Sequence, residues 1–242
     1  MTHTDNALIV VDYQNSFIPE VEWGTWELWV EWGWLLAPRI NELMKEVKTA
    51  WGLVIATRDW HPQWHMSFAS NYMWKNPFET VDWEQVVNNI PEKLELKNTA
   101  DFTLEDLQIE FWAKWSQMLW PDHCVENTSW AKYHKDLDTS LIDRHIIKWY
   151  DPTTEMYSWF FGKEDASEEK TLTEILKELW VKTVRVIWLA TDYCVQSTAA
   201  DAVKNWFNTI IDSSAIRWVA VTPWDTIAYL ETLRKKEGVD FD

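Results

Sequence analysis

The chain has 242 residues, of which 47% are hydrophobic and 25% charged, and its formal net charge is −17. This length can bury a substantial core and fits one large domain better than two small ones. The acidic balance argues against a nucleic-acid partner, because a phosphate-binding surface needs clustered Lys and Arg. No apolar run approaches the ~18 residues of a membrane span, so we expect no membrane partner.

Strand and helix patterns alternate along the chain. Continuous apolar runs are typical of strands buried on both faces, and apolar residues at helical spacing predict amphipathic helices. In chain order we expect a strand at 7–11, a helix at 35–50, strands at 53–57 and 144–148, a helix at 171–180, a strand at 183–190, a helix at 194–206, a strand at 208–212, a helix at 222–238 and a short edge strand at 239–242. This alternation predicts an α/β fold, a three-layer doubly wound and mostly parallel sheet with helices on both faces.

The rhythm breaks at residues 79–118, which are acidic, partly helical in pattern and without a clear strand. We interpret the whole chain, 1–242, as a single domain in which 79–118 is an insertion packed over one end. The two cysteines, Cys124 and Cys194, lie far apart, so a disulfide scaffold is not expected. Free thiols and an N-terminus without a basic signal segment favour a cytoplasmic protein.

Chemically useful side chains follow four of the predicted strands. Asp12 ends the first strand, Asp59 and His61 follow the second, Lys148 ends the third, and Cys194 follows the fourth. Each residue alone is commonplace, since an Asp after a strand is usually a turn residue and a buried Cys is usually inert packing. In open α/β sheets, however, active sites collect at the carboxyl ends of the strands. Their joint appearance there predicts a catalytic site.

Cys194 falls in the first turn of a predicted helix, where unpaired N–H groups and the helix dipole favour a thiolate. Asp12 could accept its proton, and Lys148 would add positive charge nearby. This is the nucleophile, base and orienting group of covalent catalysis.

A second cluster has the character of a metal site. Asp59 and His61 are two residues apart, so in extended backbone they point the same way. His123 would supply a third ligand from a distant loop, and His65 is a further ligand or a neighbour of the ligands. The residues alone leave open the alternative of a hydrogen-bonded His–Asp pair in a polar loop. Cys124 is interpreted as a packing thiol.

Five stretches together resemble the nicotinamidases, within the isochorismatase-like cysteine hydrolases. They are "ALIVVDYQNSFIP", "LVIATRDWHPQWHMSFASN", "LWPDHCVENT", "IIKWYDPTTEMYSWF" and "WLATDYCVQSTAADAV". The resemblance implies a catalytic triad of Asp12, Lys148 and Cys194, with the backbone N–H groups of Ala190 and Cys194 as oxyanion hole. It also implies a cis peptide between Leu189 and Ala190.

The same resemblance implies a divalent metal held by Asp59, His61 and His123, with His65 close by. The metal is most often Zn²⁺, with Fe²⁺ or Mn²⁺ in some members. Substrate-binding walls would come from four residues. They are Phe17, Trp120, Tyr157 and Leu189.

The implied activity is hydrolysis of nicotinamide to nicotinate and ammonia through a cysteine thioester, in NAD salvage. The implied partner is therefore a small molecule, and a homo-oligomer is compatible with the sequence. One alternative is another amide hydrolase of the superfamily, acting on a carbamoyl or ureido substrate. A second is a catalytically dead binding homologue.

The second alternative arises from the composition, which has 21 Trp and only 5 Gly. Average usage would give roughly 17 Gly in a chain of this length. Many of the tryptophans, among them Trp149, Trp159, Trp180, Trp188 and Trp206, stand where the resembling family has glycine, whereas Trp60 and Trp120 match its tryptophans. We hypothesise that UGA codons, read as glycine in some bacterial codes, are written here as tryptophan.

Overall fold

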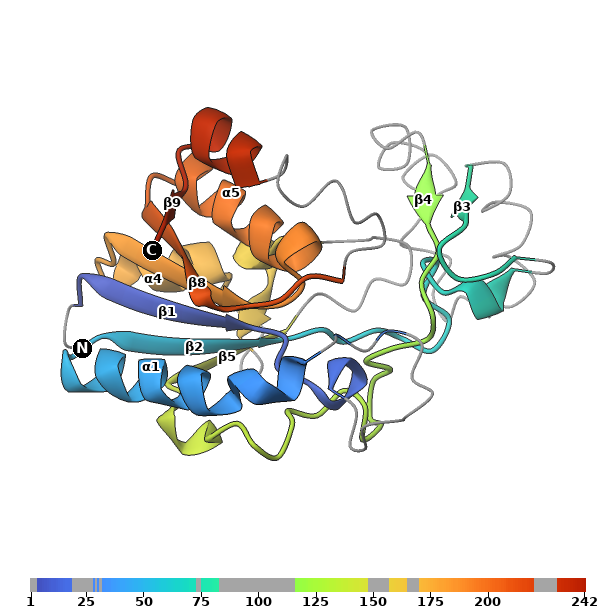
Figure 1. Cartoon of the computed structure of the whole chain (residues 1–242), viewed down its shortest axis with the longest axis horizontal. Coiled ribbons are helices and arrows are strands. Elements are labelled where there is room, and N and C mark those ends of the chain that lie inside the picture. The colour runs from blue at the N-terminus through green and yellow to red at the C-terminus, as the bar shows by residue number, and fades with distance from the viewer. Residues whose placement is uncertain are drawn as a thin grey trace.

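The structure is a computed structural model that describes residues 4–18, 28, 30, 32–72, 75–82, 116–147, 157–164, 170–219 and 230–242. Within these ranges a seven-stranded sheet has the order β6-β5-β2-β1-β7-β8-β9 (Figure 1). Its strands are β1 (Asn6–Val11), β2 (Leu53–Arg58), β5 (Arg144–Ile147), β6 (Lys163–Glu164), β7 (Thr183–Trp188), β8 (Asn208–Ile216) and β9 (Asp240–Phe241). Only the β5–β6 pair is antiparallel, so the predicted mostly parallel α/β sheet is confirmed.

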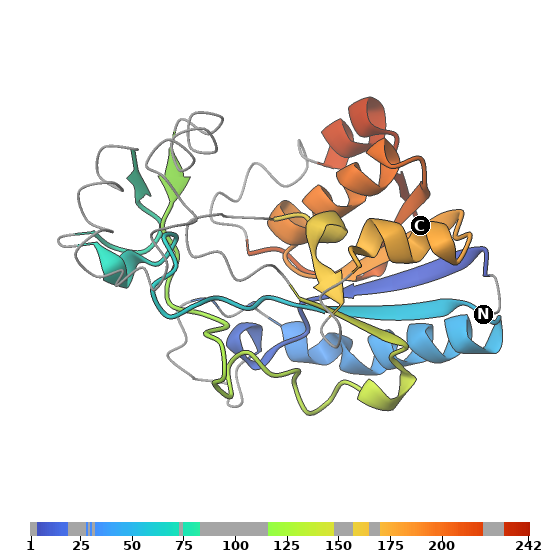
Figure 2. The same cartoon turned by 180° about the vertical axis from the view of Figure 1, so that it is seen from behind.

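Helices cover both faces of this sheet (Figures 1 and 2). Helix α1 (Ala37–Thr49) lies on one face, and α4 (Leu172–Glu178) and α5 (Gln196–Lys204) lie on the other. Helix α4 begins with a capping box of Thr171 and Glu174. A π-helical turn, η6 (Thr191–Val195), leads into α5, and a second one, η7 (Leu233–Glu237), precedes β9. Short 3-10 turns are η1 (Asn15–Phe17), η2 (Gly33–Leu36), η3 (Ala69–Asn71), η4 (Thr139–Leu141) and η5 (Trp159–Phe161).

Strand β1 shows why the chain buries two cores. Its successive side chains point to opposite faces, as the two-residue period of a strand requires. Leu8 and Val10 pack with the α1 side, in the same cluster as Met44. Ile9 packs on the other side, in the cluster that contains Leu176 of α4. A continuous apolar run therefore marks a central strand, and helices of both layers are held against it.

The structure adds to and corrects the predicted elements. Strand β6 was not expected, and β8 extends four residues beyond the predicted end at 212. Two strands, β3 (Thr80–Val81) and β4 (Gln117–Met118), pair antiparallel at the ends of the 79–118 segment, where no strand was expected. The core of that segment, 83–115, and residues 222–229 of the predicted helix at 222–238 lie outside the described residues. The single domain with an insertion stays a prediction.

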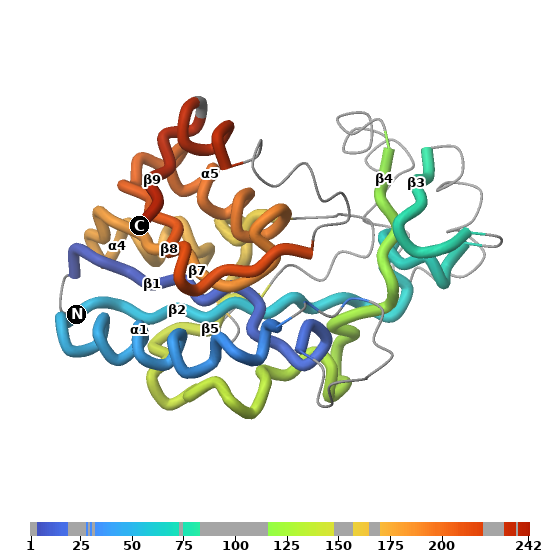
Figure 3. Tube along the Cα trace, in the orientation of Figure 1, coloured from blue at the N-terminus to red at the C-terminus, as the bar shows by residue number. Residues whose placement is uncertain are grey.

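The carboxyl ends of β1 and β2 point toward the β3–β4 pair (Figure 1). The tube in Figure 3 shows the chain after β2 running beside residues that follow β4. Isolated bridges join His61 to Val125 and Phe68 to Trp120 along this path. No helix in the described part of the chain is long and apolar enough to cross a membrane.

Three helix ends carry a tryptophan in the left-handed conformation. Trp51, Trp180 and Trp206 follow α1, α4 and α5 with φ of 59°, 63° and 71°. At each end, the N–H of the tryptophan and that of the next residue donate to carbonyls of the last helical turn at 2.8–3.1 Å. This is the Schellman motif, whose left-handed position is usually glycine. The indoles are 86%, 66% and 92% exposed, so they gain almost no packing there.

We expect the Trp206→Gly variant to be more stable than the parent by about 1 kcal/mol. Relief of the positive φ of a non-glycine residue contributes ~1–2 kcal/mol. The larger conformational entropy that glycine loses on folding offsets part of this gain. Urea unfolding measures the difference. Trp64→Gly is the matched control, since Trp64 is also exposed but is absent from the positive-φ residues. A Trp206→Gly variant no more stable than the parent would contradict this explanation.

Candidate active site

A cavity opens to solvent at the carboxyl edge of the sheet. It brings together residues from β1, the loops after β2 and β4, and the corner after β7. Its described lining residues are Asp12, Phe17, Leu28, Asp59, Trp120, His123, Tyr157, Leu189, Ala190, Tyr193, Cys194 and Val219. Four of the predicted polar residues from distant strand ends therefore line one cavity. They are Asp12, Asp59, His123 and Cys194.

Asp12 is fully buried directly after β1, with a φ of 54°. The Thr57 hydroxyl, on β2, donates to Asp12 Oδ1 at 2.7 Å and accepts from the Asp12 N–H at 3.1 Å. These two bonds fix both the backbone and the carboxylate of Asp12. A buried carboxylate held in this way is pre-positioned to exchange a proton with a neighbour in the cavity.

Cys194 is half-buried in η6, the turn that starts α5. The Leu189–Ala190 peptide just before this turn is cis, as the family resemblance implied. The Ala190 carbonyl accepts from Val195 N–H at 3.0 Å, so the corner closes back on the helix start. Among the described residues no acceptor is found for the Ala190 N–H, which belongs to a residue lining the cavity. Lys148, the predicted third member of the triad, lies outside the described residues.

Three buried side chains form a cluster with the chemistry of a metal site. Asp59 Oδ2 lies 2.9 Å from His61 Nε2 and 3.2 Å from His123 Nε2. One ligand atom from each residue lies within 4.8 Å of the others. Ligands about 2.0–2.1 Å from a tetrahedral zinc are ~3.3 Å apart, so this set is close to the required spacing. Two His and one carboxylate leave positions open, as catalytic sites do.

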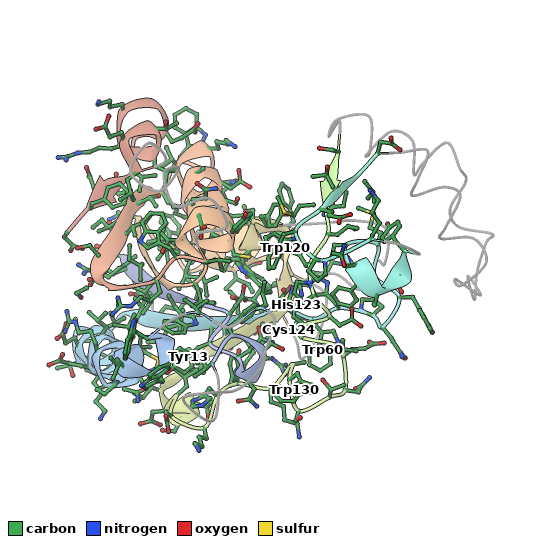
Figure 4. All side chains as sticks on the ribbon, turned by 45° about the vertical axis from the view of Figure 1, so that its right-hand side comes forward. Tyr13, Trp60, Trp120, His123, Cys124 and Trp130 are labelled. Carbon is green, nitrogen blue, oxygen red and sulfur yellow. The ribbon has the colours of Figure 1, made fainter. Side chains whose placement is uncertain are left out.

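The loop that carries His123 places it against the cavity, and Figure 4 labels it near Trp120. The His123 Nδ1 lies 2.7 Å from the Pro121 carbonyl, which favours an Nδ1–H donor and leaves Nε2 to face Asp59. His65 is close but differently engaged. Its ring centroid is 4.3 Å from that of His61, and its Nδ1 contacts the Ser67 hydroxyl at 2.7 Å.

Burial, opposed by Asp59 and aided by the neighbouring His65 and His123, lowers the pKa of His61 from 6.5 to about 4. A histidine with a low pKa stays neutral at ordinary pH. Its ring nitrogen is therefore available as a metal ligand without first losing a proton.

Aromatic rings wall the cavity beside Cys194. The Tyr193 ring stands edge-on to Trp120 at 4.8 Å and tilted to Tyr157 at 5.7 Å. Phe17 lies 5.8 Å from the His123 ring. The expected wall residues Phe17, Trp120, Tyr157 and Leu189 all line the cavity.

Three lining residues were not expected from the sequence. Tyr193 could have been found, because it adjoins Cys194 at the corner where the cavity forms. Leu28 and Val219 are not themselves in a helix or strand, and no local pattern marks them as facing a site.

The isochorismatase domain family matches residues 6–233, which is most of the chain. The protein belongs to this family. A curated nicotinamidase of Acinetobacter baylyi is 33% identical over 205 residues, covering 85% of this chain and 78% of that protein.

Solved structures of the family have the same fold. A nicotinamidase/pyrazinamidase of Acinetobacter baumannii matches with a TM-score of 0.73 and 31% identity, over 98% of this chain and 95% of the other. A pyrazinamidase of Pyrococcus horikoshii in complex with zinc matches with a TM-score of 0.66 and 29% identity, over 99% of each chain.

We expect the metal-free protein to lose stability as the pH falls. The folded-state pKa of His61 is about 4, below its ordinary value of 6.5, so the unfolded chain takes up a proton first. The contribution of neutral His61 is thus fully present above about pH 6.5 and is lost as the pH falls toward about 4. Urea unfolding between about pH 7 and about pH 4.5 measures the slope. The His61→Asn variant should show a shallower slope, and equal slopes would contradict the assignment.

Proposed function

We propose that this protein is a nicotinamidase, which hydrolyses nicotinamide to nicotinate and ammonia. The observation that carries the proposal is that Cys194, Asp12 and two residues of the Asp59–His61–His123 cluster line one cavity walled by aromatic rings. The family and the nicotinamidase relatives supply the substrate class.

The cavity suits a flat heteroaromatic amide. Phe17, Trp120 and Tyr193 offer ring faces and edges on which a pyridine ring can pack. Asp59, His61 and His123 would hold a divalent metal, with zinc as the first choice because the donor set is nitrogen and oxygen and a related pyrazinamidase is in complex with zinc. A metal held there would supply a Lewis acid beside the substrate-binding walls.

The first half of the reaction acylates the cysteine. Asp12 accepts the thiol proton, and the Cys194 sulfur attacks the carboxamide carbon. The backbone N–H groups of Ala190 and Cys194 donate to the oxygen that becomes negative. The carbon–nitrogen bond then breaks, and ammonia leaves with the proton that Asp12 returns. The product is a thioester between nicotinate and Cys194.

The second half restores the thiol. Asp12, held by Thr57, takes a proton from a water molecule that attacks the thioester carbon. The carbon–sulfur bond breaks, nicotinate departs, and the Cys194 sulfur recovers its proton. Lys148 is proposed to stabilise the charges on Asp12 and Cys194.

The other parts of the proposal concern the metabolic role, the compartment and the partners of the protein. Hydrolysis of nicotinamide would feed NAD salvage in the cytoplasm, where both free cysteines stay reduced. With a net charge of −17 the chain is expected to have no nucleic-acid or membrane partner, and a homo-oligomer is compatible with it. A carbamoyl or ureido amidase and a catalytically dead homologue are not favoured, because the curated relatives are nicotinamidases.

The Cys194→Ala variant should release no ammonia from nicotinamide, because the nucleophile is gone, while the variant still binds the substrate. A coupled ammonia assay measures turnover, and calorimetry measures binding. Cys124→Ala is the matched control: its buried side chain has no proposed role, so turnover should stay within about threefold of the parent. Ammonia release that survives in Cys194→Ala would refute the mechanism.

Removing the metal with a chelator should abolish turnover, and adding zinc should restore it. His123→Ala should not be restored, because one of three ligands is missing. His145→Gln serves as control, since His145, on β5, contacts Tyr133 rather than the metal cluster. Full turnover of a protein shown to be metal-free by elemental analysis would contradict the metal's role.

A further inference from the structure

The stretch after β1 holds the metal-ligand loops as well as supplying Asp12. The pairing of β1 with β2 ends at Val10 and Ala56, and Asp12, two residues further on, adopts a φ of 54°. Asp59 follows β2 at this point and is 97% buried, so its backbone polar groups need partners other than β1.

The Gln14 side chain provides them. Its Oε1 accepts from Asp59 N–H at 2.6 Å, and its Nε2 donates to the Asp59 carbonyl at 2.8 Å. The second Nε2 proton goes to the Ala131 carbonyl at 2.9 Å. Gln14 is fully buried, so its amide replaces a neighbouring strand and ties the Asp59 and Ala131 segments together.

Ser16 acts on the other ligand loop. Its hydroxyl accepts from Cys124 N–H at 2.8 Å, next to His123, and donates to the Trp130 carbonyl at 3.2 Å. The Cys124 carbonyl in turn accepts from His61 N–H at 3.0 Å. The side chains of Gln14 and Ser16 are therefore hydrogen-bonded to the main chain at Asp59 and beside His123. The segment of His61 is connected to them through Cys124.

We propose that Gln14 and Ser16 are positioning residues of the metal site, which set its metal affinity by holding the backbone of the ligands. This deepens the proposed function, since it rests on the metal site at Asp59, His61 and His123. Neither residue touches the metal or the substrate in this assignment.

The test measures zinc affinity of the metal-free protein by competition with a chromogenic chelator, without any substrate. Gln14→Met keeps the side-chain volume and loses all three hydrogen bonds, so zinc affinity should fall about 10–100-fold. Gln117→Met is the matched control, because Gln117 is also buried but, within the part of the chain that the structure describes, donates only to its neighbour Met118. Its zinc affinity should stay within about threefold of the parent.

Circular dichroism checks that each metal-free variant is folded. Should Gln14→Met fail to fold, Ser16→Ala removes a single hydroxyl and should still weaken zinc binding several-fold. Zinc affinity within about threefold of the parent in the folded variants would overturn the proposal. This test measures zinc binding and no turnover. Its result is therefore independent of whether the protein hydrolyses nicotinamide.

The tryptophans at positive φ carry a second, independent inference. Nine non-glycine residues have positive φ among those described, and five of them are tryptophans: Trp32, Trp51, Trp180, Trp188 and Trp206. A bulky residue in this conformation is a genuine outlier, whereas glycine adopts it freely. Gly238, which ends η7 with a φ of 73°, shows the usual residue at such a position.

Trp188 is the buried case. Its φ is 84°, at the point where the β7–β8 register shifts, and a left-handed glycine is the usual residue in one class of such bulges. The indole is fully buried, and a Cβ placed on Gly33 would lie 2.8 Å from its ring. Its Nε1 also donates to the Asp12 carbonyl at 3.3 Å, so this side chain lies against the catalytic stretch.

We infer that the five positions 32, 51, 180, 188 and 206 are glycine in the protein made by the cell. Trp60 and Trp120 are tryptophan in the same protein, because neither has positive φ and both use their rings. Trp60 lies under the Arg58 guanidinium at 5.0 Å, and Trp120 packs against Tyr193.

The codons in the gene and peptide mass spectrometry of the protein purified from its source cells test this inference. We expect UGA at all five positions with glycine in the peptides, and UGG at positions 60 and 120 with tryptophan. UGG codons, or tryptophan in the peptides, at the five positions would overturn it.

Discussion

The divergence of β1 from β2 at Asp12 is the constraint on which the site depends. Parallel strands satisfy each other's backbone groups only while they run side by side. Asp12 has a positive φ and its side chain lines the cavity. The end of β2 no longer has β1 as a partner on that side. Thr57 and Gln14 compensate with side-chain hydrogen bonds, one holding Asp12, the proposed proton acceptor, and the other the backbone of Asp59. The positions of Asp12 and of the Asp59–His61–His123 cluster thus both depend on the point where β1 and β2 stop pairing.

The corner after β7 carries Cys194, the proposed nucleophile. The cis peptide Leu189–Ala190 and the turn η6 place Cys194 at the start of a helix, on the same cavity as Asp12. A helix start offers N–H groups and a positive dipole end to a thiolate and to a developing oxyanion. The sheet edge therefore gathers the proposed nucleophile, proton acceptor and metal ligands from segments far apart in sequence.

Sequence patterns predicted the parts of this architecture that are local. Buried strands appear as apolar runs, and polar residues directly after them, such as Asp12 and Asp59, mark the carboxyl edge. Strand β6 could not be predicted, because two residues, Lys163 and Glu164, carry no periodicity. The proposed role of Gln14 could not be predicted either, since its side-chain amide is hydrogen-bonded to the backbone of Asp59, 45 residues away. Such contacts depend on the folded path of the chain rather than on neighbouring residues.

The central claim is that Cys194 forms a thioester with the pyridine carboxylate. The most direct measurement is mass spectrometry of the zinc-loaded protein, carrying glycine at positions 32, 51, 180, 188 and 206, quenched with acid during turnover of nicotinamide. The account predicts a nicotinoyl adduct on the peptide that contains Cys194, together with ammonia in solution. Ammonia release with no adduct on this peptide under any quench time, or an adduct on Cys124 instead, would contradict it.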